Sequence, residues 1–308
     1  MRIVSLCLVT LLAAAPPADA QAPFRRDAAL EAELTRLASE VDGDVGIYVR
    51  HLKTGHGALI RADELFPTAS MVKLPILAAT FQRIHDGALA FDSVLVWGDS
   101  LRYGDDDGLV NNLKPGTPVP LNQLTLMMIT TSDNAASLWL QALVGGGAAV
   151  NEWLHANGFD STRVNSRTPG RRPNWEVYGW GQTTPREIAE LLARIRDGRA
   201  VSRPASFQMY RHLTRIHWNG EALSAIPPWV QVASKQGSVD RSRSEVALVN
   251  APSGDYLFSV ITRNQRDTTY APTNQGYTLI RRVSALLWRR FEPGLPWTPP
   301  DGTAAYTP

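Results

Sequence analysis

Apolar residues recur every three or four positions along much of the chain, as in helices that bury one face. Leu30, Leu34 and Leu37 form the first such series, within residues 27–41. Residues 184–197 add a Thr cap, a Pro in the first turn and a Glu three positions after the cap, which favours a helix start. Further helices are expected at 70–86, 121–130, 134–144, 147–157, 204–215 and 273–291.

Strand patterns lie near the two ends of the chain. Two early apolar stretches flank a turn that carries Gly55 and Gly57, which predicts a hairpin. The early stretches are "DVGIYVRH" and "GALIRA", and the late ones are "WVQVASKQ", "SEVALVNA" and "DYLFSVITR". Strands at both ends with helices between them predict an α+β fold: an antiparallel sheet backed by the terminal helices, with an inserted all-helical lobe. A ligand is expected in a cleft between the two lobes.

The expected organisation is one main domain between two terminal segments. The domain covers residues 21–291, with a sheet lobe of 27–65 and 216–291 and a helical lobe of 66–215. Residues 292–308 are rich in Pro and are expected to form a loose tail.

Residues 1–20 have the features of a secretory signal. A short basic start precedes an apolar stretch too brief to span a bilayer comfortably, and Ala18-Asp19-Ala20 forms a cleavage site before Gln21. An uncleaved membrane anchor is the alternative. The only cysteine, Cys7, lies in this segment. We therefore expect a periplasmic or secreted bacterial protein without disulfides or stable membrane insertion.

Composition narrows the classes of function. Hydrophobic residues make up 44% and charged residues 19% of the chain, and the net charge is only +2. Basic and acidic residues are interspersed, which argues against nucleic-acid binding. The six histidines form no H-x-x-x-H pair, so we expect neither a metal nor a cofactor. A monomer that binds a small molecule is expected.

The first chemical signal is a lysine three residues after a serine. Only four lysines occur among the 31 basic residues, and Lys73 follows Ser70 in an apolar run. Lys can lose its proton in a low-dielectric site, whereas Arg cannot. On one helical turn the two side chains share a face, and Met71, Leu74 and Ile76 would desolvate the amine. Ser70 as nucleophile beside Lys73 is thus a plausible pair for acyl transfer.

Two more motifs follow along the chain. Ser132-Asp133-Asn134 lies between two helical stretches, and taken alone it fits a helix cap. Lys235-Gln236-Gly237-Ser238 ends an apolar strand, and taken alone it fits a turn with a solvated Lys. All three motifs, in this order and on these elements, are much harder to explain by chance than any one of them.

These motifs resemble those of the class A β-lactamases and, more widely, the penicillin-recognising serine hydrolases. The resemblance extends over residues 27–291 and includes Phe66-Pro67. It also includes "PGTPVPLNQL", "EWLHANGF" and "TTPREIAELL". It implies a β-lactamase/DD-peptidase-like fold with a catalytic domain at 21–291.

The resemblance also implies a role for each motif. Ser70 would attack the β-lactam carbonyl, and the N–H groups of Ser70 and Ser238 would form the oxyanion hole. Lys73 would take the nucleophile's proton or hold the network that does so. Ser132 would relay a proton to the leaving ring nitrogen, and Asn134 would bind the substrate's side-chain amide.

Further residues are expected to bind substrate by the same resemblance. Lys235 would attract the substrate carboxylate, helped by Arg241 or Arg243, although the spacing of neither arginine fits cleanly. Gly237 and Ser238 would belong to the substrate-binding set, and Tyr103 resembles an aromatic residue that walls the cleft in many members.

The chain departs from the family pattern at two places. Gln236 stands where the family has a hydroxyl residue, which alters the orientation of the substrate carboxylate. The family's loop Glu, which activates water for deacylation, is also missing, because Ser166, Arg167 and Thr168 are not acidic. Glu176 is the only acid between residues 161 and 186. It either reaches the water from another direction or is a solvated loop carboxylate.

Several functions remain open. The expected function is hydrolysis of penicillin- or cephalosporin-type antibiotics, as in resistance enzymes. The alternatives are a penicillin-binding DD-peptidase-like enzyme acting on peptidoglycan stem peptides and a slowly deacylating sensor. Gly98-Asp99-Ser100-Leu101 resembles the nucleophile block of GDSL esterases, but no Asp-x-x-His follows to activate Ser100.

Overall fold

The computed structural model describes residues 21–104 and 108–308, so the expected signal at 1–20 lies outside the described part. Its α-helices are α1 Ala28–Ala38, α2 Lys73–His85, α3 Leu121–Thr130, α4 Asn134–Leu143, α5 Gly146–Ala156, α6 Arg172–Tyr178, α7 Pro185–Arg196, α8 Arg203–Leu213 and α9 Gln275–Phe291. Its 3₁₀ segments are η1 Ala69–Val72, η2 Asp99–Leu101, η3 Leu223–Ala225 and η4 Thr303–Tyr306. Its strands are β1 Arg25–Arg26, β2 Asp44–His51, β3 His56–Ile60, β4 Phe66–Pro67, β5 Val94–Val96, β6 Pro118–Pro120, β7 Arg163–Val164, β8 Gly181–Thr183, β9 Val232–Val239, β10 Ser242–Val249 and β11 Tyr256–Arg263.

The main sheet joins strands from both ends of the chain. Its order is β1-β3-β2-β11-β10-β9. β2 and β11 are antiparallel, from Asp44 opposite Arg263 to His51 opposite Tyr256. β10 is antiparallel to both β11 and β9, and only the short β1 runs parallel to its neighbour β3. The prediction of an α+β fold with a mostly antiparallel sheet from both chain ends is confirmed.

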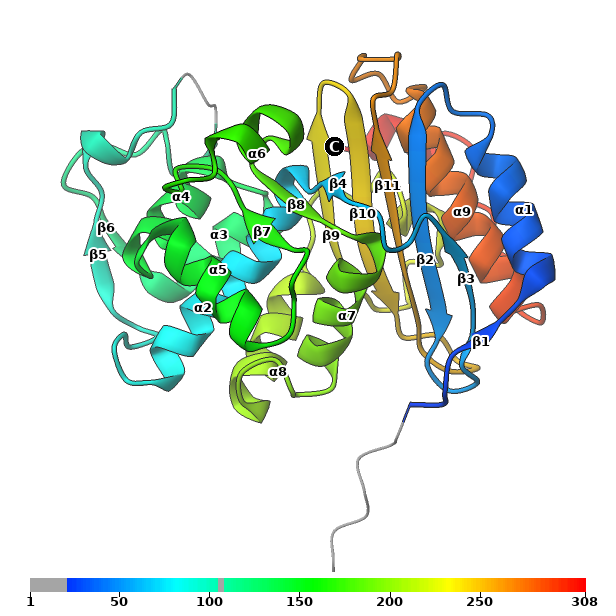
Figure 1. Cartoon of the computed structure of the whole chain (residues 1–308), viewed down its shortest axis with the longest axis horizontal. Helices are drawn as coiled ribbons and strands as arrows, with labels where there is room; N and C mark the ends of the chain where they lie inside the picture. Colours follow the sequence, from blue (N-terminus) through cyan, green and yellow to red (C-terminus); the bar gives the residue numbers. More distant parts are fainter. Residues whose placement is uncertain (1–20, 105–107) are drawn as a thin grey trace, which may run out of the picture.

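Helices cover both faces of this sheet. Figure 1 shows α1 and α9 against one face and α7, with the helical lobe behind it, on the other. Along β10, Val246 and Leu248 join the core shared with the helical lobe. Ala247 and Val249 join the core under α1 and α9. Because alternate side chains enter different cores, β10 is apolar throughout its second half, Val246–Val249.

The helical lobe is built around α2. Leu74, Leu77 and Phe81 on this helix are buried, together with most of the residues between them. A helix enclosed on every side must be apolar all round, which explains why α2 has no polar face over this stretch. This burial fixes the position of Lys73, the first residue of α2.

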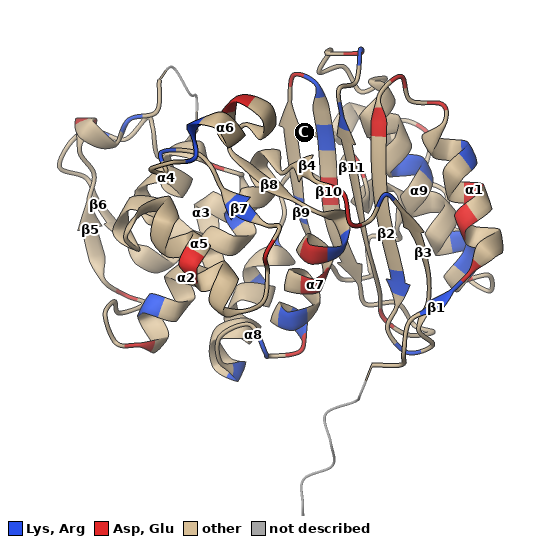
Figure 2. Cartoon of the chain, in the orientation of Figure 1, with Lys and Arg blue, Asp and Glu red and all other residues tan. Residues whose placement is uncertain are grey.

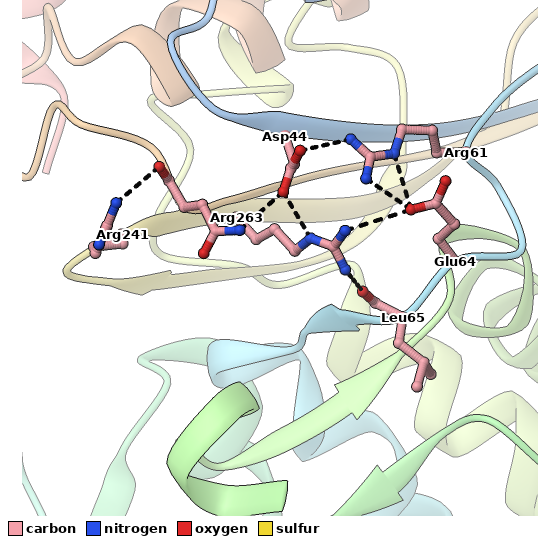
Figure 3. A network of polar contacts seen from close by, with 7 residues as sticks. Asp44, Arg61, Glu64, Leu65, Arg241 and Arg263 are labelled. Atoms are coloured by element: carbon pink, nitrogen blue, oxygen red, sulfur yellow. Dashed lines mark hydrogen bonds and ion pairs between the residues drawn. The ribbon is translucent and has the colours of Figure 1, made fainter.

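A polar network ties the sheet to the segment that leads to Ser70 (Figure 3). Asp44 accepts hydrogen bonds from Arg61 at 2.7 Å and from Arg263 at 3.0 Å. The hydrogen bond from Arg61, more than any other contact, lowers the pKa of Asp44 to about 2. Arg263 also donates to the carbonyl oxygen of Leu65 at 2.5 Å. Since Leu65 leads directly into β4 and then Ser70, the network fixes this segment to the sheet.

Figure 2 shows acidic and basic residues scattered over helices, strands and loops of the described chain. Many of them form ion pairs, some between distant parts of the chain, such as Arg186 with Asp63 and Arg282 with Glu40. This distribution agrees with the small net charge of +2.

The structure differs from the sequence-based expectations in three places. No helix was expected within residues 165–180, but they include α6, and β7 and β8 on either side of it join β4 in a small second sheet. A two-stranded sheet of β5 and β6 was not expected either. The segment expected to be a loose tail makes specific contacts at its start: Trp297 packs edge-on against Trp229, and the Trp288 indole N–H donates to the carbonyl of Leu295 at 2.8 Å.

Candidate active site

Ser70 lies in η1, directly before α2. The residue before it, Ala69, has a φ of 44°. That left-handed conformation costs a non-glycine residue about 1–3 kcal/mol, so the surrounding structure must hold it in place. Part of this support comes from Thr68, whose N–H donates to the carbonyl of Gly181 at 2.9 Å.

The amine of Lys73 contacts both expected catalytic serines. Its Nζ lies 3.0 Å from Ser70 Oγ and 3.0 Å from Ser132 Oγ. It also donates to two carbonyl oxygens, the backbone oxygen of Ser132 and Oδ1 of Asn134, each at 2.7 Å. Lys73 is completely buried. The predicted Ser-x-x-Lys pair is therefore within hydrogen-bond distance, as proton transfer requires.

The Ser132 loop is shaped by the residue that follows it. Asp133 is the N-cap of α4, and its carboxylate accepts from the N–H of Ala136 at 2.8 Å and of Val110 at 2.9 Å. Ser132 has a φ of 63°. The cap thus accounts for Asp133, while Ser132 and Asn134 on either side of it contact Lys73. The motif therefore caps α4 through Asp133 and also contacts Lys73 through Ser132 and Asn134.

Lys235 reaches the same hydroxyl from the sheet. Its Nζ lies 3.1 Å from Ser132 Oγ, and the side chain is completely buried. Burial first, and then the neighbouring Lys73, holds the pKa of Lys235 well below its usual value, while Glu245 acts in the opposite direction. Burial also raises the pKa of Glu245 to about 7. Ser132 Oγ can accept from both amines and still donate its own hydrogen.

Gln236 folds back onto Lys235. Its Oε1 accepts from the Lys235 Nζ at 2.9 Å, and its backbone oxygen accepts from the same amine at 3.0 Å. With its oxygen used in this way, the amide NH₂ of Gln236 is the group left to donate to a ligand. Gln236 lines the cavity described next.

Glycine is required at the next position. A Cβ added to Gly237 would lie 2.8 Å from the backbone nitrogen of Ser70 and 2.7 Å from the carbonyl oxygen of Thr68. The end of β9 therefore passes directly beside Ser70. The Ser238 hydroxyl lies 2.8 Å from that of Tyr277.

A cavity of about 1490 Å³ brings most of the expected residues together. Ser70, Ser132, Asn134, Gln236, Gly237 and Ser238 line it. Lys73 and Lys235 contact this wall through Ser132 Oγ. The site contains a hydroxyl nucleophile, Ser70, beside a buried amine, Lys73, and a second hydroxyl that contacts two amines. These are the groups that acyl transfer by a serine enzyme uses.

Arg243 does not take part in this cavity, contrary to the expectation. Its guanidinium donates to the carbonyl oxygens of Val239, Ser242 and Thr269. The expected alternative, Arg241, donates to the carbonyl oxygens of Gln265 and Asn264. Both arginines hold backbone segments instead of facing a ligand.

Arg243 nonetheless shapes the cavity. Its guanidinium carbon lies 4.4 Å from the ring centroid of Tyr270 and 4.9 Å from that of Tyr277. Both tyrosines line the cavity. The role that the structure gives Arg243 is to position these two rings by cation–π contact.

Glu176 also lies away from Ser70. It is in α6, its side chain is 57% exposed, and it accepts from Arg172 Nε at 2.8 Å. It is not among the residues that line the cavity. Of the two readings of Glu176, the geometry favours a solvated loop carboxylate.

Tyr103 lines a second, smaller cavity of about 550 Å³ rather than the cavity of Ser70. Its ring packs edge-on against Trp180, with centroids 5.1 Å apart. The Trp180 ring centroid lies 6.0 Å from the Nζ of Lys73. Trp180 therefore stands between the buried amine and the second cavity. Sequence reasoning missed it, because a single Trp before a strand carries no periodic or motif signal.

Ser100, the alternative nucleophile, is exposed in η2 and does not line the cavity of Ser70. Within residues 21–104 and 108–308, no group of three or more His, Cys, Asp or Glu residues is placed to hold a metal. In the same ranges, no helix has both the length and the apolar character needed to cross a membrane.

The chain is similar in sequence and in structure to proteins of known families. The model of the β-lactamase enzyme family matches residues 29–291. Among solved structures, PBP-A is 25% identical, with a TM-score of 0.79 over 89% of this chain and 99% of its own. A β-lactamase from Sphaerobacter thermophilus is 22% identical, with a TM-score of 0.77 over 88% and 100% of the two chains. A class A β-lactamase from Mycobacterium abscessus is 21% identical, with a TM-score of 0.75 over 85% and 99%.

Proposed function

The chain belongs to the β-lactamase enzyme family and is a hydrolase of its serine type, and from this premise we propose that it opens β-lactam rings through an acyl-enzyme on Ser70. The substrates we propose are penicillin- and cephalosporin-type compounds. The observation that carries the proposal is the position of one buried amine, Lys73, within 3.0 Å of both the Ser70 and the Ser132 hydroxyls.

The contacts of Lys73 fit an amine that accepts a proton. An uncharged amine has two N–H donors and one lone pair. The two nearest partners, the carbonyl oxygens of Ser132 and Asn134, can accept only, so they suit the two donors. The lone pair then suits a hydroxyl donor such as Ser70 at 3.0 Å. Ser132 Oγ, also at 3.0 Å, accepts an N–H from Lys73 only when this amine is protonated.

The proposed acylation proceeds in two proton transfers. Ser70 Oγ bonds to the lactam carbonyl carbon while its proton passes to Lys73. The carbon–nitrogen bond then breaks, and the ring nitrogen receives a proton from Ser132 Oγ, which is replenished from the adjacent amine. Water later cleaves the ester and regenerates the Ser70 hydroxyl.

Recognition of the substrate carboxylate is assigned to Lys235 and Gln236. Lys235 supplies an amine beside Ser132, and Gln236 supplies an NH₂ donor because its oxygen accepts from Lys235. We propose that this amide binds and orients the substrate carboxylate, as the hydroxyl residue does in the family. No contribution from Arg241 or Arg243 is needed.

The test is mass spectrometry of the mature protein mixed with a penicillin, combined with nitrocefin turnover. An adduct confined to the peptide that contains Ser70, and lost in Ser70→Ala, is the expected result. Ser100→Ala is the matched control, because Ser100 is exposed and away from the cavity. An adduct that persists in Ser70→Ala would refute the assignment.

A penicillin-binding protein that deacylates slowly is the second candidate. Two observations favour it: Glu176 faces solvent, and Trp180 covers the side of Lys73 toward the second cavity. The time course of the adduct separates the two candidates. Loss within seconds with product release supports a β-lactamase, whereas an adduct stable for many minutes supports the penicillin-binding protein. A panel of D-Ala-D-Ala stem peptides tests a role in cell-wall metabolism.

We further propose that the protein acts as an exported monomer, outside the cytoplasm of a bacterium and without nucleic-acid partners. The support is the signal-like segment at 1–20 and the small net charge. N-terminal sequencing of the secreted protein, with Gln21 expected first, tests the export.

A further inference from the structure

The cavity that contains Ser70 extends well beyond the catalytic side chains. Its volume of about 1490 Å³ exceeds the roughly 300–1,000 Å³ of common ligand pockets. Its far end is lined by the C-terminal tail, through Pro299, Thr303, Ala304, Thr307 and Pro308. The family match ends at residue 291, so this wall is an addition to the matched domain.

The tail lies on the Ser132 side of the cavity. The N–H of His217 donates to the carbonyl of Thr130 at 3.0 Å, and the Trp218 indole N–H donates to that of Thr131 at 2.8 Å. These bonds place the segment after α8 directly beside the Ser132 loop.

Two residues further on, this segment meets the tail. A Cβ added to Gly220 would lie 2.5 Å from Cγ2 of Thr307. The lining is therefore continuous from Ser132 through Trp218 and Gly220 to the tail. In the proposed reaction Ser132 protonates the leaving nitrogen, so this is the direction in which the leaving group lies.

The tail is held in place by specific contacts. Its base is fixed by the hydrogen bond from Trp288 to the Leu295 carbonyl and by the edge-on packing of Trp297 on Trp229, with centroids 5.2 Å apart. Gly302, with a φ of 84°, turns the chain into η4. A wall anchored in this way can select among ligands.

The chemistry of the wall indicates what it contacts. The side chains of the tail residues that line the cavity are small and uncharged, and those of Thr303 and Thr307 carry hydroxyl groups. Charged lining residues in this part of the cavity, Glu221 and Arg281, come from the domain instead. The tail face is thus suited to an uncharged organic substituent.

We propose that residues 298–308 form the outer wall of a leaving-group subsite and favour β-lactams with a large uncharged substituent on that side of the ring. The inference rests on the proposed acylation of Ser70. It predicts a preference for cephalosporins with an aromatic group on the six-membered ring, on the carbon beside the one that carries the carboxylate.

The first experiment removes the wall. A chain that ends after Trp297 keeps both anchors. We expect its kcat/KM to fall about tenfold for the aromatic-substituted cephalosporin. For the methyl-substituted counterpart it should stay within about twofold, because that compound does not reach the tail. An equal change for both compounds, or none, would overturn the inference.

Single substitutions provide a matched pair that leaves the tail intact. Ala304 and Ala305 are adjacent and exposed in η4, but only Ala304 lines the cavity. Ala304→Trp should reduce kcat/KM for the large cephalosporin alone, and Ala305→Trp should change neither compound. Equal effects of the two substitutions would contradict the proposal. Mass spectrometry of the intact protein distinguishes failure of the wall inference from failure of the proposed function. If no Ser70 adduct forms, the proposed function fails as well. If adducts form but the variants keep the substrate preference of the wild type, only the wall inference is refuted.

Discussion

The Ser70 cluster and the 165–180 loop lie on either side of Lys73, and they differ in how closely sequence dictates geometry. In the cluster, three short motifs bring Ser70, Lys73, Ser132 and Lys235 into a row in which each contacts the next at about 3 Å. In the loop, the one acid faces solvent and an aromatic ring, Trp180, faces the amine instead.

The difference separates the two halves of the proposed reaction. Acylation needs groups that are fixed by helix and strand geometry, so it can be inferred from spacing. Deacylation needs a water held by a loop, and loop geometry depends on many weak contacts. The proposed acylation therefore rests on groups that the structure brings together, whereas the breakdown of the acyl-enzyme depends on the surroundings of Trp180.

The largest expected effect tests the cluster itself. Ser70→Ala removes the nucleophile and should lower kcat by about 10⁴-fold or more. The readout is steady-state hydrolysis of nitrocefin, with circular dichroism to confirm folding. Activity near the wild-type level would show that the reacting hydroxyl lies elsewhere.

The next effect distinguishes the two buried lysines. Lys73→Ala removes the proposed base and should slow acylation about 10³-fold in stopped-flow measurements. Lys235→Ala removes the proposed amine partner of the substrate carboxylate and should lower kcat/KM about 10- to 100-fold, mainly through KM. If both variants lose kcat equally, the division of roles between the amines is wrong.

A smaller effect is expected from the loop. Trp180→Ala opens the covered side of Lys73 to water and should speed deacylation about tenfold, since water exclusion protects reactive intermediates. Acylation should change much less. Trp175→Ala is the control, because Trp175 is 41% exposed and stacks on Arg172. If the lifetime of the adduct is the same in Trp180→Ala as in the wild type, the Trp180 ring does not limit deacylation.

The smallest effect is expected at Glu176. Its ion pair with Arg172 is exposed and contributes at most about 1 kcal/mol. Glu176→Gln should therefore leave both acylation and deacylation within about twofold of the wild type. A large, selective loss of deacylation would mean that the loop rearranges in the complex and brings this carboxylate to the water.

The sequence predicted most of the fold and of the cluster because both depend on local patterns. The helices from α1 to α5 and α7 to α9 all lie within a few residues of their expected ranges, as do β2, β3, β9, β10 and β11. Each is long enough to carry several turns or alternations of apolar residues.

What the sequence could not supply are contacts between distant polar groups. The sequence pattern places Arg243 on a strand. It does not show that the guanidinium donates to the carbonyl oxygen of Thr269. Gln236 could be recognised as a departure, but not the fold of its side chain back onto Lys235. The tail looked unstructured because its anchors, Trp229 and Trp297, pair across loops without any periodic pattern.

The pairing of β2 with β11 has a consequence for how the protein is made. These strands bring together Asp44 and Arg263, which are 219 positions apart, so the sheet cannot close until nearly the whole polypeptide has left the ribosome. Long-range pairing of this kind also slows folding. Under the proposed export, a nascent chain that stays unfolded so long suits a translocation channel that passes unfolded protein, and the enzyme would become active only after transport.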